Sequence, residues 1–87
     1  MAVFMVERSL KGIAMDDLAA AQRAAIETSK QFTSQGRPVE YLRSTFVPDD
    51  GRCMCLFSAA SADDVKAVND TAKIPYDRVT PALDLPG

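Results

Sequence analysis

The stretch that decides the fold is Tyr41-Leu42-Arg43-Ser44-Thr45-Phe46-Val47, followed by Pro48-Asp49-Asp50-Gly51 and Arg52-Cys53-Met54-Cys55-Leu56-Phe57. Two β-rich runs around a Pro-Asp-Asp-Gly turn predict a β-hairpin. Side chains along a strand alternate between the two faces of a sheet. We expect one face to carry Tyr41, Arg43, Thr45, Val47, Cys53, Cys55 and Phe57, and the other to carry Leu42, Ser44, Phe46, Met54 and Leu56. The hairpin therefore predicts a sheet with one packed face and one face kept for another purpose.

The flanking segments predict two helices and two further strands. Residues 2–8 are β-rich and predict a strand, and residues 76–83 predict another. A helical period runs through residues 15–35 on the stripe Leu18, Ala21, Ala25, Ser29 and Phe32. Gly36 ends this helix. Ser61-Ala62-Asp63-Asp64 resembles a capping box and predicts a second helix, with Ala62, Val65, Val68 and Ala72 facing inward.

The resulting order, βαββαβ, is that of a ferredoxin-like α+β fold in a single domain over residues 1–87. Right-handed crossovers place both helices on one face of a four-stranded antiparallel sheet. We expect the apolar partners of the helices to be Phe4, Val6, Leu42, Phe46, Met54, Leu56 and Val79. The opposite face is then a mixture of polar and apolar side chains, which a small monomer rarely exposes. Two such faces would meet in a homodimer that forms a dimeric α/β barrel with a lined interior.

Composition excludes several classes of partner. The 87 residues carry ten Lys and Arg and twelve Asp and Glu, so the net charge is −2, and no basic run exists. Binding to nucleic acid or to an anionic membrane surface is therefore not expected. No apolar stretch approaches the ~20 residues that a membrane span needs. Residues 1–8 lack the pattern of a signal peptide, and the expected location is the cytoplasm. His is absent, which removes the usual general base and metal ligand.

Three segments resemble one bacterial family. They are residues 6–13, the hairpin with its Arg52-Cys53-Met54-Cys55-Leu56-Phe57 core, and residues 68–79. This family of small proteins is known as domain of unknown function 4242, and some of its members are called nickel-binding proteins. The resemblance implies a ferredoxin-like fold and a homodimeric α/β barrel. It names nickel or another divalent metal as a possible cofactor, although the lack of His weakens that expectation.

The two cysteines support three interpretations. Cys53 and Cys55 are expected to project from one strand in the same direction, and they are either small buried thiols, a pair of soft metal ligands, or a redox pair. A metal site would need further ligands, with Glu7 or the cysteines of a second subunit as candidates. A disulfide is not expected, because residues i and i+2 of a strand lie about 6.5–7 Å apart.

Glu7, Arg43 and Arg78 are expected to meet inside the barrel. They would form either an internal ion pair or a set of guanidinium groups that awaits an anionic ligand. The candidate ligand-binding residues of the inner sheet face are Glu7, Tyr41, Arg43, Thr45, Cys53, Cys55, Tyr76 and Arg78. No catalytic residue is assigned.

Three functions are compatible with this pattern. The first is a non-catalytic homodimer that binds a small ligand or a metal ion in the barrel interior. The second is a cofactor-free enzyme of the oxygenase or isomerase type, which rests on analogy between folds. The third is a purely structural or regulatory dimer.

Overall fold

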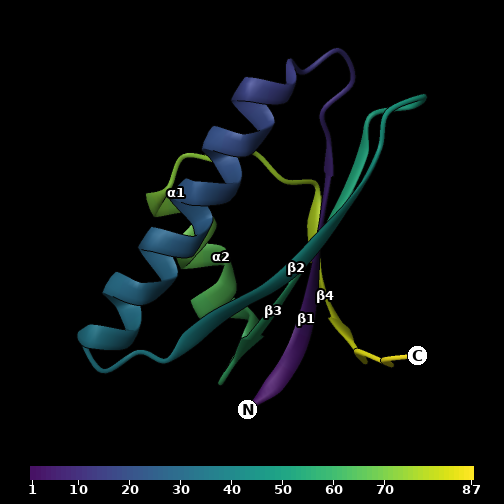
Figure 1. Ribbon diagram of the computed structural model, residues 1–87. Coiled ribbons are helices and arrows are strands. Elements are labelled where there is room, and N and C mark those ends of the chain that lie inside the picture. Colours follow the sequence, from purple (N-terminus) through teal and green to yellow (C-terminus); the bar gives the residue numbers. More distant parts are fainter.

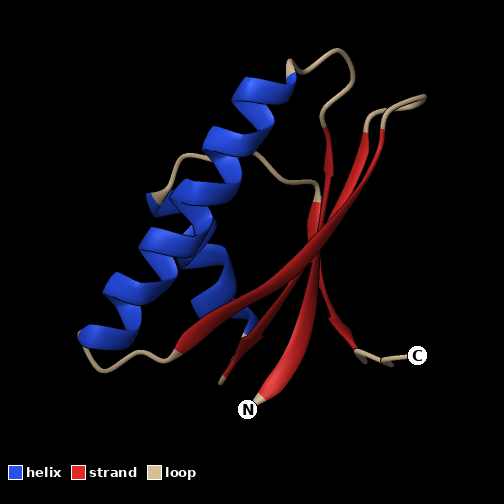
Figure 2. Ribbon diagram, in the orientation of Figure 1, coloured by secondary structure: helices blue, strands red, loops and turns tan.

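The computed structural model describes residues 1–87 and has the predicted order of elements (Figure 1). The chain runs through β1 (Ala2–Ser9), α1 (Met15–Ser34), β2 (Val39–Val47), β3 (Arg52–Ala59), α2 (Ala62–Thr71) and β4 (Arg78–Ala82). The four strands form one antiparallel sheet in the order β2-β3-β1-β4. Both helices cover the same face of this sheet, and the other face is open (Figure 2). The ferredoxin-like prediction is therefore confirmed.

The helices lie where their periodic patterns place them. In α1, the residues that bury against the sheet are Ala25, Thr28, Ser29 and Phe32, close to the predicted stripe. Ser61 caps α2, because its side chain accepts a hydrogen bond from the backbone N–H of Asp64. Val65 and Val68 of α2 are fully buried. Neither helix is long and apolar enough to cross a membrane.

The core lies between the helices and the sheet, but the sheet presents a different set of side chains from the one expected. In β3, Cys53, Cys55, Phe57 and Ala59 are buried toward the helices, while Met54 and Leu56 lie on the open face. The prediction for β3 was wrong by one residue of register. Val47 pairs with Arg52 across the turn, so the odd-numbered residues of β2 from Arg43 to Val47 share a face with even-numbered residues of β3.

A β-bulge corrects the prediction for β2 as well. The register shifts between Tyr41 and Arg43, so that Tyr41 pairs with Phe57 and Arg43 with Leu56. The extra residue, Leu42, leaves Tyr41 and Ser44 on the same face although they are three residues apart. Tyr41 therefore packs edge-on against Phe57 on the helix side, with ring centroids 5.4 Å apart. Arg43 and Thr45 stay on the open face, as predicted.

The hairpin turn packs closely against the loop that follows β1. Gly51 has a φ of +75° and accepts a hydrogen bond from the backbone N–H of Leu10 at 2.7 Å. A Cβ at position 51 would lie 2.3 Å from Lys11 Cα, which is backbone and cannot swing aside. The turn that sets the hairpin register therefore depends on a glycine at this position.

We expect Gly51→Ala to destabilise the protein far more than Gly36→Ala. Both glycines have a positive φ, and the left-handed conformation costs a residue with a Cβ roughly 1–2 kcal/mol. A Cβ at Gly36 meets nothing within 4 Å, whereas at Gly51 it collides with Lys11. Overpacking of this kind adds roughly 1–3 kcal/mol. Urea denaturation of the two variants measures the difference, and equal free energies of unfolding would contradict the proposed close approach.

Candidate functional site

The open face of the sheet carries two ion pairs. Glu7 on β1 and Arg78 on β4 stand opposite each other and form a contact between Arg78 Nε and Glu7 Oε2. Arg43 on β2 pairs instead with Asp84, at 3.1 Å between Nη2 and Oδ2. The structure thus brings Glu7 and Arg78 together as expected, but Arg43 has a separate partner from the C-terminal tail.

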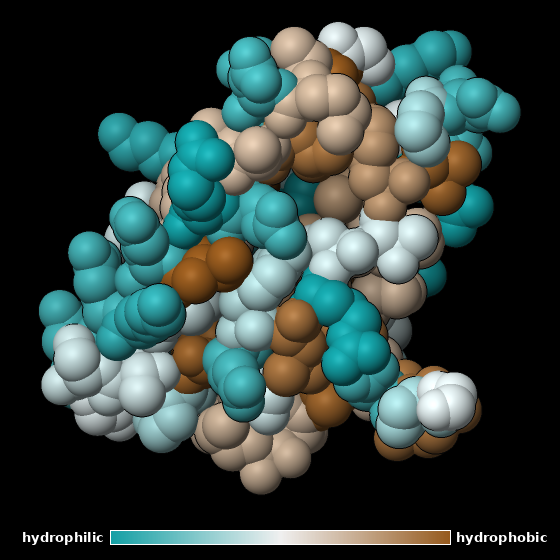
Figure 3. All heavy atoms as spheres, in the orientation of Figure 1, coloured by the Kyte–Doolittle hydropathy of each residue, from teal (hydrophilic) through white to brown (hydrophobic).

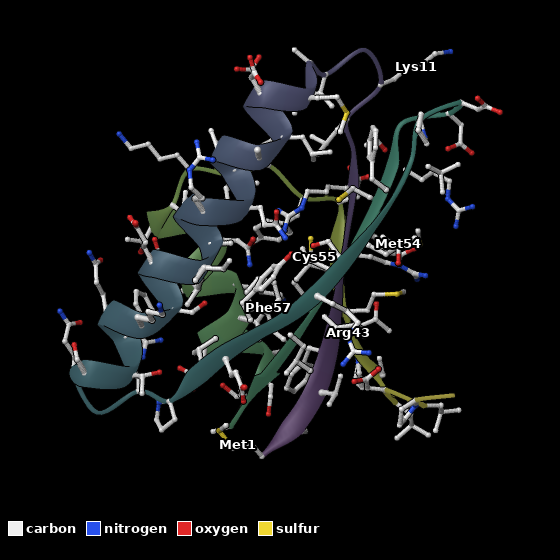
Figure 4. The ribbon with its side chains drawn as sticks, viewed as in Figure 1. Met1, Lys11, Arg43, Met54, Cys55 and Phe57 are labelled. Carbon is white, nitrogen blue, oxygen red and sulfur yellow. The ribbon has the colours of Figure 1, made fainter.

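The C-terminal tail lies on the open side of the sheet. Strands β2 and β4 are the two edges of the sheet, so the Arg43–Asp84 pair spans it. Arg43 and Met54 point away from the helices, while Phe57 points toward them (Figure 4). Leu83 and Leu85 leave 82% and 81% of their surface exposed, and Met1 leaves 71%. Because Val3 pairs with Ala82, these three apolar side chains belong to the same end of the sheet.

The two thiols and Glu7 do not form a metal site in this chain. Glu7 pairs with Met54 and therefore lies on the open face, whereas Cys53 and Cys55 lie on the helix face. A sheet separates the thiols from Glu7, and from any subunit that covers the open face. No group of three or more His, Cys, Asp or Glu side chains could hold a metal ion. The residues present therefore do not fit the nickel expectation.

Tyr76 also lies apart from the open face. It precedes β4, packs against the core and donates a hydrogen bond from its hydroxyl to Asp70 Oδ1 at 3.1 Å. Burial and the neighbouring Asp70 raise the pKa of Tyr76 above its ordinary value. Its position on the helix side corrects the expectation that it belongs to the inner sheet face. Of the eight candidate residues, only Glu7, Arg43, Thr45 and Arg78 lie on the open face.

A pocket of about 170 Å³ lies on the other side of the sheet, between α1 and the strands. In the space-filling view a recess opens between the N-terminal part of α1 and the strands (Figure 3). Its apolar lining consists of Leu10, Leu18, Ala21, Ala25, Phe46 and Ile74. Its polar lining consists of Arg8, Gln22, Tyr41, Ser44, Cys53 and Cys55. Three of the residues predicted for the ligand site, Tyr41, Cys53 and Cys55, therefore do line a pocket together, but not the expected one.

The polar side chains form one continuous track along this pocket. Gln22 Nε2 donates to Tyr41 Oη at 3.1 Å, and the Tyr41 hydroxyl in turn bonds the Ser44 hydroxyl. Ser44 Oγ donates to Cys55 Sγ at 2.9 Å. Cys53 Sγ lies 3.8 Å from Cys55 Sγ, and both cysteines are free thiols. The bulge in β2 makes this track possible, because it turns Tyr41 and Ser44 to the same side.

Arg8 closes the buried end of the track. Only 4% of its surface is exposed. Its Nη1 donates to the backbone oxygen of Pro75 at 3.2 Å and its Nη2 to Asn69 Oδ1 at 3.0 Å. Asn69 is held in turn by its own bond to the Val65 carbonyl at 2.9 Å. Both acceptors of Arg8 are neutral, and none of the three ion pairs of the chain includes Arg8.

The sequence analysis missed Arg8, Gln22 and Ser44 as pocket residues. Arg8 had a visible signal, since the alternation that turns Phe4 and Val6 toward the helices also turns Arg8 there. A charged residue on a core face is rare unless it is paired, which makes it a marker of a site. Ser44 and Gln22 had no comparable signal, because their meeting depends on the bulge and on how α1 packs.

The thiol next to Arg8 stays protonated at neutral pH. Burial, together with the adjacent Cys55, raises the pKa of Cys53 from 9.0 to about 11, and Arg8 offsets only part of this rise. Cys53 therefore supplies no negative charge to balance the guanidinium group. It is also a weak nucleophile, because the thiolate is the reactive form.

The comparisons with known proteins agree with this architecture. The family model described as "Nickel responsive protein SCO4226-like" matches residues 4–81. The chain belongs to the SCO4226-like family. The crystal structure of SCO4226 from Streptomyces coelicolor A3(2) is similar to this chain, with a TM-score of 0.82 and 26% identity over 97% of this chain and 100% of that one. No curated protein matches the chain. The family model thus places the chain in a family that is described as nickel responsive. The resemblance to domain of unknown function 4242 stays a prediction.

The raised pKa predicts slow alkylation of Cys53. In the Cys55→Ser variant, Cys53 is the single thiol, and burial, the largest cause of its raised pKa, remains. Because a raised pKa lowers the thiolate fraction, iodoacetamide at pH 8 should react much more slowly with the folded variant than with the same chain in urea. Equal rates would contradict the burial of this thiol.

The same shift predicts a loss of stability at high pH. The folded state holds the Cys53 proton more tightly than the unfolded chain does. The stability that the protonated thiol contributes to the folded state is therefore complete below pH 9 and is lost as the pH rises toward about 11. Urea denaturation across this range should show a steeper loss for the wild type than for Cys53→Ala. The comparison removes the titration of other groups, which the two proteins share.

Proposed function

We propose that this member of the SCO4226-like family acts in the cytoplasm as a non-catalytic homodimer, in which two open sheet faces meet and enclose a small ligand. The single observation that carries the proposal is the character of the open face. Its cross-strand rows mix apolar and charged side chains, as in the row Arg43, Leu56, Met5 and Thr80 and the row Thr45, Met54, Glu7 and Arg78. A second copy would cover the apolar side chains and leave the polar ones to line the interior.

Two further observations support dimerisation. A chain of 87 residues buries a smaller share of its surface than a larger domain does, and a partner compensates for this. The exposed Met1, Leu83 and Leu85 extend the apolar surface at one end of the open face.

The two free cysteines fit a reducing compartment such as the cytoplasm.

Binding is favoured over catalysis by the state of the charged groups. An acid–base enzyme needs a carboxylate or another base that is free to exchange a proton with a substrate. The Glu7 carboxylate is engaged by Arg78, and Asp84 is engaged by Arg43. No observation in the open face favours the oxygenase or isomerase alternative.

The dimer is tested with Leu56→Glu, which places a charge at the centre of the open face. Native mass spectrometry of the wild type should show two chains together with the additional mass of a ligand. Leu56→Glu should be monomeric, because the dimer would bury two unpaired carboxylates, and its dissociation constant should rise roughly 100-fold or more. Met15→Glu is the matched control, since Met15 is 65% exposed on α1. A monomeric wild type would contradict the proposal. A dimer without added mass would contradict ligand binding and support the purely structural dimer instead.

Nickel is tested separately, because the family description names it. Imidazole is a side chain that suits nickel, and the chain has none. Elemental analysis after dialysis against Ni²⁺ should therefore find well under one ion per dimer. Nickel that is retained in full and lost in Cys53→Ser/Cys55→Ser would contradict this and assign the thiols as ligands. Loss in Glu7→Gln instead would assign the ion to the space between the sheets.

A further inference from the structure

We propose that the pocket beneath α1 is a second binding site, which takes a small monocarboxylic acid with a compact apolar body and holds its carboxylate on Arg8. The pocket lies on the helix side of the sheet, opposite the face that is proposed to form the dimer. The proposal is therefore independent of dimerisation and of any ligand between the two sheets.

The charge of Arg8 is the first argument. Guanidinium stays charged at any physiological pH, and a buried charge without a counter-ion is costly. Arg8 is buried, its two hydrogen bonds go to neutral oxygens, and the neighbouring Cys53 thiol is uncharged at pH 7. These two bonds to oxygen use only two of its five N–H donors, and the Cys53 sulfur is a weak acceptor for one more. An anion that reaches the end of the pocket would supply the missing counter-charge.

The fixed position of Arg8 is the second argument. The Pro75 carbonyl and Asn69 hold the guanidinium group from behind, and Val65 holds Asn69. These contacts come from α2 and from the loop after it, while the side chain starts on β1. Three separate segments thus orient one cation before a ligand arrives, which lowers the entropic cost of binding.

The shape of the pocket selects the rest of the ligand. An apolar cavity of about 150 Å³ holds a molecule the size of benzene, so about 170 Å³ has room for a six-membered ring or a short branched chain. Leu10, Leu18 and Phe46 contribute to an apolar lining for that part. A single cation in this lining suits one carboxylate, whereas a phosphate dianion would bring an excess negative charge.

The entrance to the pocket lies between α1 and the edge strand β2. Gln22 and Ser44 are exposed, whereas Arg8 at the other end is buried. The hydrogen bond from Gln22 to Tyr41 joins the two elements across this entrance. A ligand would enter between them with its carboxylate first and pass along the polar track toward Arg8.

The test uses benzoate and 3-methylbutanoate as probes, with benzamide as the neutral counterpart of benzoate. Binding to the wild type is measured by isothermal titration calorimetry and by NMR chemical-shift changes of backbone amides. At least one of the two acids should bind at roughly millimolar concentration or below and should shift amides of α1 and β3. Because a hydrogen bond to a charged group contributes about 1.5–3 kcal/mol, benzamide should bind roughly 10- to 100-fold more weakly than benzoate.

Two variants and one control complete the test. Arg8→Gln should lose roughly 10- to 100-fold in affinity for the acids, and Arg23→Gln, an exposed Arg→Gln change on α1, should leave it unchanged. Because Arg8→Gln also removes structural hydrogen bonds, Ala21→Leu provides a second test: it keeps Arg8, fills the cavity and should abolish binding in a folded protein. The proposal is overturned if neither acid binds, if benzamide binds as tightly as benzoate, or if Ala21→Leu binds as the wild type does.

Discussion

The register of the β2–β3 hairpin is the constraint on which the rest of the structure depends. A four-residue turn pairs Val47 with Arg52, and Gly51 lets this turn pass directly under Lys11. This pairing turns Cys53, Cys55 and Phe57 toward the helices and Met54 and Leu56 toward the open face. A slip by one residue would exchange every side chain of β3 between the two faces, since the side-chain period of a strand is two.

Because of the bulge at Leu42 and the burial of Arg8, polar and charged side chains lie on both sides of the sheet, in the pocket beneath α1 and on the open face. The bulge adds Tyr41 and Ser44 to the thiols, which creates a polar track inside an otherwise apolar pocket. Arg8 closes that track with a charge that has no counter-ion. The open face keeps its own charges, Glu7 with Arg78 and Arg43 with Asp84, in pairs. The one buried cation, which has no counter-ion, is therefore on the side of the sheet that the helices cover.

Much of the fold could be predicted because its signals are local. The stripe of α1, the Ser61 cap of α2 and the turn around Gly51 each depend on residues within a few positions of one another, and all three are confirmed. The site was predicted only in part. Glu7 and Arg78 meet as expected. The thiols were assigned to the wrong face, because alternation within each strand does not say which residues of the two strands share a face; the pairing across the four-residue turn decides that. The bulge that turns Tyr41 had no signal in the residues themselves.

The sequence alone determined the order of elements, the ferredoxin-like topology and the absence of imidazole chemistry, because periodicity, capping and composition act within short segments. Tertiary structure decided which side chains share a face and which of them meet. Arg8, Asn69 and Pro75 come together from β1, from α2 and from the loop that follows it, although more than 60 residues separate Arg8 from the others. Hydrogen bonds over such separations form only once the sheet and helices pack, so no local pattern encodes the pocket.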